Sequence, residues 1–264
     1  MTEDRVLLAV DGAVATVTIN RPEARNSLLR GMGGEIYAKL REVAADRDVR
    51  ILVLRGAGRD FCAGADMKAK KNAGDRPPPP DFDAYQVTVL LHEMPQVTIA
   101  AIRGACAGAG LGYAAACDLR VADDDARINT AFLDVGVAGD MGVPWSLPRL
   151  VGPGHARDLM FFPRKLGSVD ALDIGLVQRV WATDSFEAEL TAMTASLAGA
   201  APLALGAMKA NFVEAERTDL RSFVTIEAER HIRLAPTESG GDPACKQTSA
   251  YIAMQMRVAF TRLT

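Results

Sequence analysis

Two glycine-rich stretches decide the fold: Arg55-Gly56-Ala57-Gly58-Arg59-Asp60-Phe61-Cys62-Ala63-Gly64-Ala65-Asp66-Met67-Lys68 and Ile102-Arg103-Gly104-Ala105-Cys106-Ala107-Gly108-Ala109-Gly110-Leu111-Gly112. Short apolar runs precede them, at 51–54 and 97–102, and such runs are typical of strands buried on both faces. Turns built from small residues leave backbone N–H groups uncovered. Two uncovered N–H groups aimed at one point form an oxyanion hole, which stabilises negative charge on a carbonyl oxygen.

Strand and helix signals alternate through the first two-thirds of the chain, as is typical of a parallel α/β architecture. The last third carries only helix signals. We therefore expect an α/β core over residues 1–200 and a helical region over residues 201–264. Besides the two apolar strands, the predicted elements are a hairpin over 5–20, a helix presenting Met32, Ile36, Leu40 and Val43, a surface loop over 69–83, a helix over 82–93, a helix of small residues that begins near Gly108 and runs to 117, strands at 119–121 and 127–129, a short helix that Ser168 caps and Gly175 ends, and helices over 186–197, 202–216, 219–234 and 243–264.

The composition is that of an ordinary globular protein, with 49% hydrophobic and 24% charged residues and a net charge of −3 over 264 residues. The sequence lacks the stripe of basic residues that a nucleic-acid-binding protein usually shows. Its apolar runs are all shorter than the ~20 residues of a membrane span. The four cysteines (Cys62, Cys106, Cys117 and Cys245) are scattered, without metal-site or disulfide spacing. We therefore expect reduced thiols in the cytoplasm and no bound metal; the acidic run 123–125 is expected to be solvated.

The two glycine-rich turns, with their preceding strands, resemble those of the crotonase (enoyl-CoA hydratase/isomerase) superfamily. Three further segments are similar to that family's motifs in the same order: Asn20-Arg21-Pro22-Glu23-Ala24-Arg25-Asn26-Ser27-Leu28, the stretch 134–152 with Val137-Ala138-Gly139-Asp140-Met141-Gly142 inside it, and Ala171-Leu172-Asp173-Ile174-Gly175-Leu176-Val177. The resemblance covers roughly residues 5–235. It implies a spiral of ββα units followed by helices that build a homotrimer or a dimer of trimers, and a role in acyl-CoA metabolism such as that of fatty acids.

The resemblance also implies an acyl-CoA thioester as the ligand, with coenzyme A as part of the substrate and no separate cofactor. Matched position by position, the oxyanion-hole amides are those of Ala65 and Ala109. The residues implied to bind the substrate and its CoA moiety are Arg25, Ala63, Gly64, Asp66, Met67, Lys68, Gly108, Gly112 and Phe132.

Hydratases of this family use two glutamates to position water and to deliver its proton. The matching positions here are Gly112 and Phe132, neither of which can transfer a proton. Asp140, within the stretch 134–152, stands at the position where isomerising subfamilies such as the dienoyl-CoA isomerases carry an aspartate. Burial of this aspartate among small and apolar residues would raise its pKa and make it a better base. We therefore predict an isomerase that shifts a double bond in an enoyl-CoA, with Asp140 as the only acid/base.

Three alternatives stay open. The first is an enoyl-CoA hydratase, a lyase that adds water to a 2-enoyl-CoA through another acid such as Asp134. The second is the family's dehalogenase chemistry, in which an aspartate at the Asp140 position attacks an aromatic ring, although no partner histidine matches. The third is an acyl-CoA-binding protein without catalysis, which the loss of both hydratase carboxylates motivates.

Overall fold

The structure is a computed structural model that describes residues 4–72 and 82–234. Contacts divide the chain into two compact units, Met1–Ala198 and Gly199–Thr264. The predicted helix over 243–264 lies outside the described residues. The elements are β1 (Val6–Asp11), β2 (Val14–Ile19), η1 (Pro22–Ala24), α1 (Met32–Ala45), β3 (Ile51–Gly56), α2 (Met67–Asn72), α3 (Phe82–Glu93), β4 (Val97–Ile102), β5 (Ala105–Ala107), α4 (Ala109–Ala116), β6 (Leu119–Asp123), β7 (Arg127–Asn129), η2 (Leu133–Val135), α5 (Val143–Phe161), β8 (Leu166–Gly167), α6 (Ser168–Asp173), β9 (Arg179–Trp181), α7 (Phe186–Ala198), α8 (Pro202–Ala215) and α9 (Leu220–Leu234).

The first unit is built on two sheets. The larger has the strand order β1-β2-β3-β4-β6-β9, in which only the β1–β2 hairpin is antiparallel. The smaller has the order β5-β7-β8. Successive parallel strands need a crossover segment between them, and α1 and α3 supply it between β2, β3 and β4. The mixed α/β fold predicted from the sequence is therefore confirmed.

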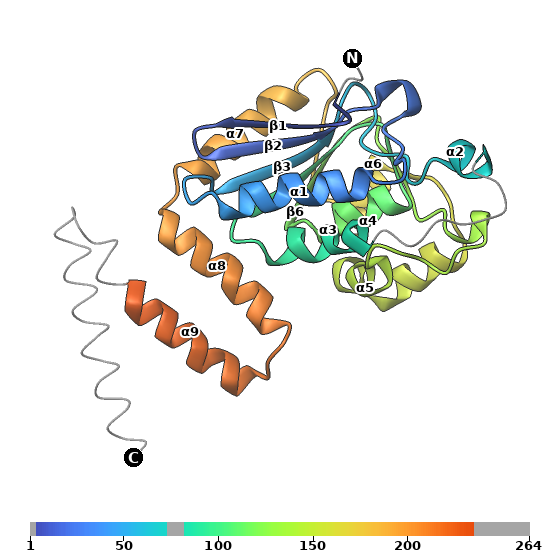
Figure 1. Ribbon diagram of the computed structural model, residues 1–264. Coiled ribbons are helices and arrows are strands. Elements are labelled where there is room, and N and C mark those ends of the chain that lie inside the picture. The colour runs from blue at the N-terminus through green and yellow to red at the C-terminus, as the bar shows by residue number, and fades with distance from the viewer. Residues whose placement is uncertain (1–3, 73–81, 235–264) are drawn as a thin grey trace. The chain divides into compact units, whose positions relative to one another are not determined.

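The core of this unit lies where α1 and α3 pack together and α1 covers one face of β1 and β2. Alternation along β2 places Ala15, Val17 and Ile19 in this core, each fully buried, as the two-residue period of a strand requires. The four residues that predicted the helix over α1 (Met32, Ile36, Leu40 and Val43) are all buried. Figure 1 shows α7 on the other side of β1, β2 and β3 from α1.

Two local predictions are wrong. The surface loop predicted over 69–83 is wrong at both ends, because Met67–Asn72 form α2 and α3 begins at Phe82; residues 73–81 lie outside the described part. Ser168 is the first residue of α6 and does not cap it, since the cap position is Gly167 and makes no side-chain bond. The Ser168 hydroxyl instead donates to the Asp124 carbonyl oxygen at 3.0 Å. A contact 44 residues away in sequence therefore overrides the local capping preference.

The described part of the second unit consists of α8 and α9, which pack against each other. Pro202 opens α8, where its missing N–H costs nothing. The Asp219 carboxylate accepts bonds from the amides of Arg221 and Ser222 and caps α9. In the described ranges, no single helix is long and apolar enough to cross a membrane; only the bent pair α7 and α8 reaches that length and composition together.

Candidate functional site

The first glycine-rich turn is held in place from both sides. Cys62 pairs with Cys106, the middle residue of β5: the Cys62 amide donates to Ala105 O and the Ala107 amide donates to Cys62 O, both at 2.9 Å. Ala65 pairs with Leu28, whose amide donates to Gly64 O at 2.8 Å. The Leu28 carbonyl accepts from Asp66 N at 3.0 Å. In such a parallel bridge the central residue's own N–H points away from its partner. The Ala65 amide therefore faces away from the Leu28 segment.

The second turn ends in the N-terminus of α4. Gly108 is the cap residue, with φ 53° and ψ −121°, a conformation that side-chain-bearing residues rarely adopt. Its amide donates to Asn129 O at 3.2 Å, which fixes the turn against β7. Ala109 is the first residue of the helix, so its N–H has no acceptor within the helix and lies at the positive end of the helix dipole.

The two turns touch at the glycines that precede Ala65 and Ala109. A methyl group built on Gly64 would lie 2.9 Å from Ala107 O and 3.6 Å from Gly108 Cα, so only glycine permits this approach. Within residues 4–72 and 82–234, neither the Ala65 amide nor the Ala109 amide donates a hydrogen bond. Two amides without a hydrogen-bond acceptor thus follow directly after the two glycines at which the turns touch.

Asp140 is carried by a loop of unusual backbone conformation. Gly139, Met141 and Gly142 have φ values of +106°, +47° and +71°, and such a conformation persists in a residue with a side chain only when its surroundings enforce it. Asp140 itself is half-buried, and its carbonyl accepts from Val143 N at 3.0 Å, at the start of α5. The loop therefore presents one partly buried carboxylate in a defined backbone frame.

Met141 attaches this loop to α4. A methyl group on Gly112 would lie 2.3 Å from Met141 Cβ and 2.9 Å from Met141 O, so the backbone of the loop lies directly on the helix. Gly112 is three residues after Ala109, about one turn along α4. Asp140 and the second turn are thereby fixed to the same short helix. Neither Met141 nor its contact with Gly112 was singled out from the sequence, where only the small-residue run 137–142 hinted at a tight loop.

This contact gives a prediction about stability. Gly112→Ala is expected to lower the free energy of unfolding by about 1–3 kcal/mol, because the added methyl group displaces the Met141 backbone. Gly154→Ala in α5 is the matched control, since no atom lies within 4 Å of its methyl position and alanine favours a helix by up to about 1 kcal/mol. Urea unfolding measures both. Equal stability of the two variants would contradict the packing of Met141 on α4.

Phe132 and Gly112 are the positions at which the resemblance expects the hydratase glutamates. Phe132 is 4% exposed, and its ring edge lies 4.0 Å from the Cβ position of Gly108, so it forms an apolar wall beside the second turn. The space that a side chain at position 112 would occupy is filled by Met141. Asp134, the other acid considered, is exposed at η2. Asp140 is the acid next to Met141, whose backbone packs on α4 at Gly112.

Asp66 organises the segment after the first turn. Its Oδ1 accepts from the amides of Lys68 and Ala69 at 3.1 and 3.0 Å, which caps α2. Its Oδ2 accepts from both terminal nitrogens of Arg21 at 3.2 Å. The amide of Ala69 and then Arg21 hold the pKa of this carboxyl below its ordinary value, against the effect of burial. Asp66 therefore positions α2 and its exposed residues Met67 and Lys68, and the sequence did not indicate its bond to Arg21.

Arg25 and Ala63 lie beside each other, because the Ala63 amide donates to the Arg25 carbonyl at 3.1 Å. The Arg25 side chain is exposed and pairs with Asp60, with Nε 3.2 Å from Oδ2. Asn26, fully buried, donates to the carbonyls of Ala57 and Asp60 at 2.9 and 2.5 Å and so shapes the first turn. Sequence reasoning missed this role, although Asn26 stands in the early motif.

The expectation that the acidic run 123–125 is solvated is wrong for Asp123, whereas Asp124 is exposed. Asp123 is 2% exposed and accepts from Arg103 Nε and Gly104 N, both at 3.4 Å. Burial raises the pKa of its carboxyl despite these bonds. Asp125 pairs with Arg59. The residues that the structure describes contain no cluster of three or more His, Cys, Asp and Glu that could hold a metal ion.

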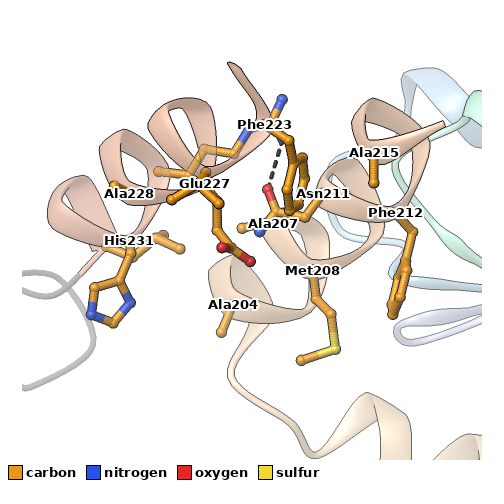
Figure 2. A pocket seen from close by; sticks show the side chains of 13 residues that line it. Ala204, Ala207, Met208, Asn211, Phe212, Ala215, Phe223, Glu227, Ala228 and His231 are labelled. Atoms are coloured by element: carbon orange, nitrogen blue, oxygen red, sulfur yellow. Dashed lines mark hydrogen bonds between the residues drawn. The ribbon is translucent and has the colours of Figure 1, made fainter. Parts of the chain in front are cut away.

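A groove of about 710 Å³ lies in the second unit, between α8 and α9 (Figure 2). Its wall is mostly apolar and includes Met208, which is 57% exposed, and Phe212, which is 70% exposed. Arg230 donates to Asn211 Oδ1 across it at 2.7 Å. The groove contains none of the predicted catalytic or CoA-binding residues.

Comparisons with known proteins identify relatives of this chain. The sequence profile of the enoyl-CoA hydratase/isomerase family matches residues 9–241. The chain is 32% identical over 214 residues to the mitochondrial Delta(3,5)-Delta(2,4)-dienoyl-CoA isomerase of Rattus norvegicus, covering 76% of this chain and 65% of that protein. It is 36% identical over 178 residues to "Probable enoyl-CoA hydratase EchA14" of Mycobacterium tuberculosis, covering 67% and 70%. A Thermobifida fusca structure in complex with acetoacetyl-CoA superimposes with a TM-score of 0.78 at 28% identity, covering 88% and 95%.

Proposed function

Because this chain belongs to the enoyl-CoA hydratase/isomerase family, we propose that it moves a carbon–carbon double bond within an enoyl-CoA thioester. The observation that carries the proposal is the contact between the two turns at Gly64 and Gly108, each of which is followed by an amide without a hydrogen-bond acceptor, that of Ala65 and that of Ala109. The Asp140 loop packs on the helix that Ala109 begins. Relatives named as isomerases, such as the rat dienoyl-CoA isomerase, support the proposal.

In the proposed reaction the thioester oxygen accepts hydrogen bonds from the Ala65 and Ala109 amides. The Asp140 carboxylate removes a proton from one carbon next to the double bond. The C–H electron pair moves into the conjugated system and places negative charge on the thioester oxygen, which the amides and the α4 dipole stabilise. The protonated Asp140 then returns the same proton to the other end of the system. Atoms and charge balance without water, metal or further cofactor, since coenzyme A is part of the substrate.

We propose that the CoA moiety runs along the first turn and α2. Lys68 and Arg25 are exposed cations on this path, and phosphate groups are bound by such side chains. Ala63, Gly64 and Met67 complete the path, and Phe132 and Gly108 line the acyl end. Asp66 acts through α2, because its carboxylate is occupied by Arg21 and two amides.

Enoyl-CoA hydration is the second candidate, favoured by the relative named as a hydratase. It requires an acid that positions water, and Asp134 at η2 is exposed. A CoA-ester-binding protein without catalysis is the third candidate, because Gly112 and Phe132 replace both hydratase carboxylates. These candidates differ in the change each makes to a conjugated enoyl group.

Ultraviolet absorbance separates the three functions. We expect purified protein to convert 3-enoyl-CoA into the conjugated 2-enoyl-CoA, or to shift the double bonds of a dienoyl-CoA, so that absorbance of the conjugated band changes. A hydratase would bleach the band of 2-enoyl-CoA instead. If the protein binds CoA esters but changes the absorbance of none of the three substrates (2-enoyl-, 3-enoyl- and dienoyl-CoA), the isomerase proposal is overturned in favour of the binding protein.

We further propose that the chain assembles as a homotrimer or a dimer of trimers in the cytoplasm. The exposed apolar side chains of α8 and α9 support assembly, since an apolar patch of this kind marks an interaction surface. The buried free thiols of Cys62, Cys106 and Cys117 suit a reducing compartment. Light scattering is expected to give three or six times the chain mass of 28.1 kDa; a monomer would contradict the assembly.

A further inference from the structure

Arg21 joins the early motif (residues 20–28) to the end of the first glycine-rich turn. Its backbone is fixed by Asn26, because Arg21 N donates to Asn26 Oδ1 at 2.8 Å and Asn26 N donates to Arg21 O at 2.9 Å. Its side chain is 14% exposed. Nη1 donates to Ser27 O at 2.6 Å, and both terminal nitrogens donate to Asp66 Oδ2 at 3.2 Å. One guanidinium group therefore holds two segments that are distant in sequence.

The bond from Arg21 to Ser27 fixes the peptide group between Ser27 and Leu28. Ser27 O and Leu28 N belong to this one planar group and point in opposite directions, because the peptide bond is trans. Ser27 O accepts from the guanidinium, and Leu28 N donates to Gly64 O at 2.8 Å. Rotation of the group would weaken both bonds at once. Arg21 therefore sets the direction in which the Leu28 amide points.

The Leu28 amide in turn fixes the peptide group between Gly64 and Ala65. Gly64 O accepts from Leu28 N, and the Ala65 N–H lies on the opposite edge of the same planar group. The Ala65 N–H therefore points away from the early motif. Two peptide groups in series connect the Arg21 guanidinium to this amide, and each is too stiff to absorb a rotation of the other.

Asp66 holds the same connection from the other strand. Asp66 N donates to Leu28 O at 3.0 Å, and the Asp66 carboxylate accepts from Arg21. Arg21 thus contacts Ser27, directly before Leu28, and Asp66, directly after Ala65, on the two sides of the Leu28–Ala65 bridge. Separation of the two segments would break the Arg21 bonds together with those of the bridge.

The direction of the Ala65 N–H matters because an oxyanion donor acts only when it is aimed at the place where the charged oxygen will lie. A hydrogen bond weakens steeply when the donor turns away from its acceptor. Ala65 is exposed, so packing of its own methyl group does not hold it. Its orientation depends on the bonds that its neighbours make.

We propose that Arg21 is a positioning residue of the oxyanion hole, which aims the Ala65 N–H at the thioester oxygen through the two peptide groups. Arg21 acts without touching the substrate, since its terminal nitrogens donate to Ser27 and Asp66. The inference rests on the proposed acyl-CoA function and adds a residue to the same site.

The infrared band of a bound thioester tests the proposal without turnover. The probe is butanoyl-CoA, a saturated ester, labelled with a heavy carbon isotope at its carbonyl. Hydrogen bonds from an oxyanion hole weaken the C=O bond, so binding to the wild-type protein should lower the frequency of this band below that of the ester in water. Arg21→Met removes the donors and should shift the band back toward the frequency in water. Arg21→Lys offers one nitrogen in place of two and should give an intermediate frequency.

Steady-state kinetics supplies the second readout. Arg21→Met is expected to lower kcat for double-bond migration by about 10–100-fold, which is less than the cost of losing a whole oxyanion donor. Arg21→Lys should recover part of this loss. KM should change by a smaller factor, because a misdirected donor weakens the transition state more than the bound substrate.

Gln96→Leu is the control for a general loss of stability. Gln96 is 2% exposed and lies directly before β4, whereas the second turn follows the other end of that strand. Like Arg21 it donates to backbone carbonyls, which are those of Val43, Asp46 and Val49. The leucine variant should melt at a lower temperature than the wild-type protein but keep the wild-type band and kcat.

The outcomes separate this proposal from the proposed function. A wild-type band in Arg21→Met, or an equal shift in Gln96→Leu, overturns the role of Arg21 while the oxyanion hole stands. If Arg21→Met does not fold, Arg21→Lys decides, and a wild-type band in that variant overturns the proposal. If butanoyl-CoA does not bind, or binds to the wild-type protein without a lowered band, the oxyanion hole and Arg21 both fall. Band shifts as expected in a protein that converts no enoyl-CoA support Arg21 and reject the isomerase.

Discussion

Asp140→Asn is expected to lower kcat for double-bond migration by about 10²–10⁴-fold, the usual contribution of a general acid–base group. The amide has nearly the shape of the carboxylate but does not accept the substrate proton. The backbone frame of the loop should survive, because its bond from Val143 N uses the Asp140 carbonyl. KM and the affinity for a saturated CoA ester should change little. Steady-state kinetics and calorimetry on the same preparation measure both.

Asp134→Asn is the matched control for this experiment. The two aspartates lie six residues apart in one segment, but Asp134 is exposed at η2. With Asp140 as the base, the Asp134 variant keeps nearly the wild-type rate. The reverse pattern is a normal rate in the Asp140 variant and a loss of activity in the Asp134 variant. It would contradict the assignment of Asp140 as the general base and favour the hydratase candidate.

Ala109→Pro should lower kcat by about 10²–10³-fold, because proline removes one oxyanion donor, worth about 2.7–4 kcal/mol in the transition state. Ala109 is the first residue of α4, where proline is favoured and where no helical hydrogen bond is lost. The preceding Gly108 has ψ −121°, outside the helical region that a following proline disfavours. The fold is therefore expected to accept this substitution.

Ala109→Gly provides the comparison, since it keeps the N–H while removing the methyl group. The glycine variant should retain most activity, and the proline variant should lose it at similar stability, as checked by urea unfolding. The pyrrolidine ring also occupies space in front of the turn, so KM is expected to rise. A folded proline variant with wild-type kcat would show that the Ala109 amide does not hold the transition-state charge.

The sequence alone predicted the elements that depend on near neighbours in the chain. The apolar runs before the two turns form β3 and β4, the spacing of Met32, Ile36, Leu40 and Val43 forms α1, and Asp219 caps α9. The motifs also indicated the family, which the profile match over residues 9–241 confirms. These signals are readable because strand period, helix period and caps are set within a few residues.

Where local preference competes with a distant contact, the sequence was a poor guide. Ser168 has the chemistry of a cap but bonds to the Asp124 carbonyl, and Asp123 looks solvated but is buried beside Arg103. The Asp66 carboxylate, predicted to lie among the substrate-binding residues, bonds to Arg21 and to the amides at the start of α2, and the sequence did not indicate the bond to Arg21. Each outcome depends on a partner at least 20 residues away along the chain.

The amino-acid sequence by itself determined that two turns of small residues follow apolar strands and that Asp134 and Asp140 are the acids of the stretch 134–152. It also determined that Gly112 and Phe132 stand where the family resemblance implies the hydratase glutamates. Only the tertiary structure decided that the turns touch at Gly64 and Gly108, and that Met141 occupies the space beside Gly112 and fixes the Asp140 loop to α4. The sequence gives the type and spacing of the residues, whereas contacts between distant segments depend on how the strands and helices pack together. A glycine in the sequence indicates that a side chain does not fit at that position, but only the packed structure shows which neighbour occupies the space.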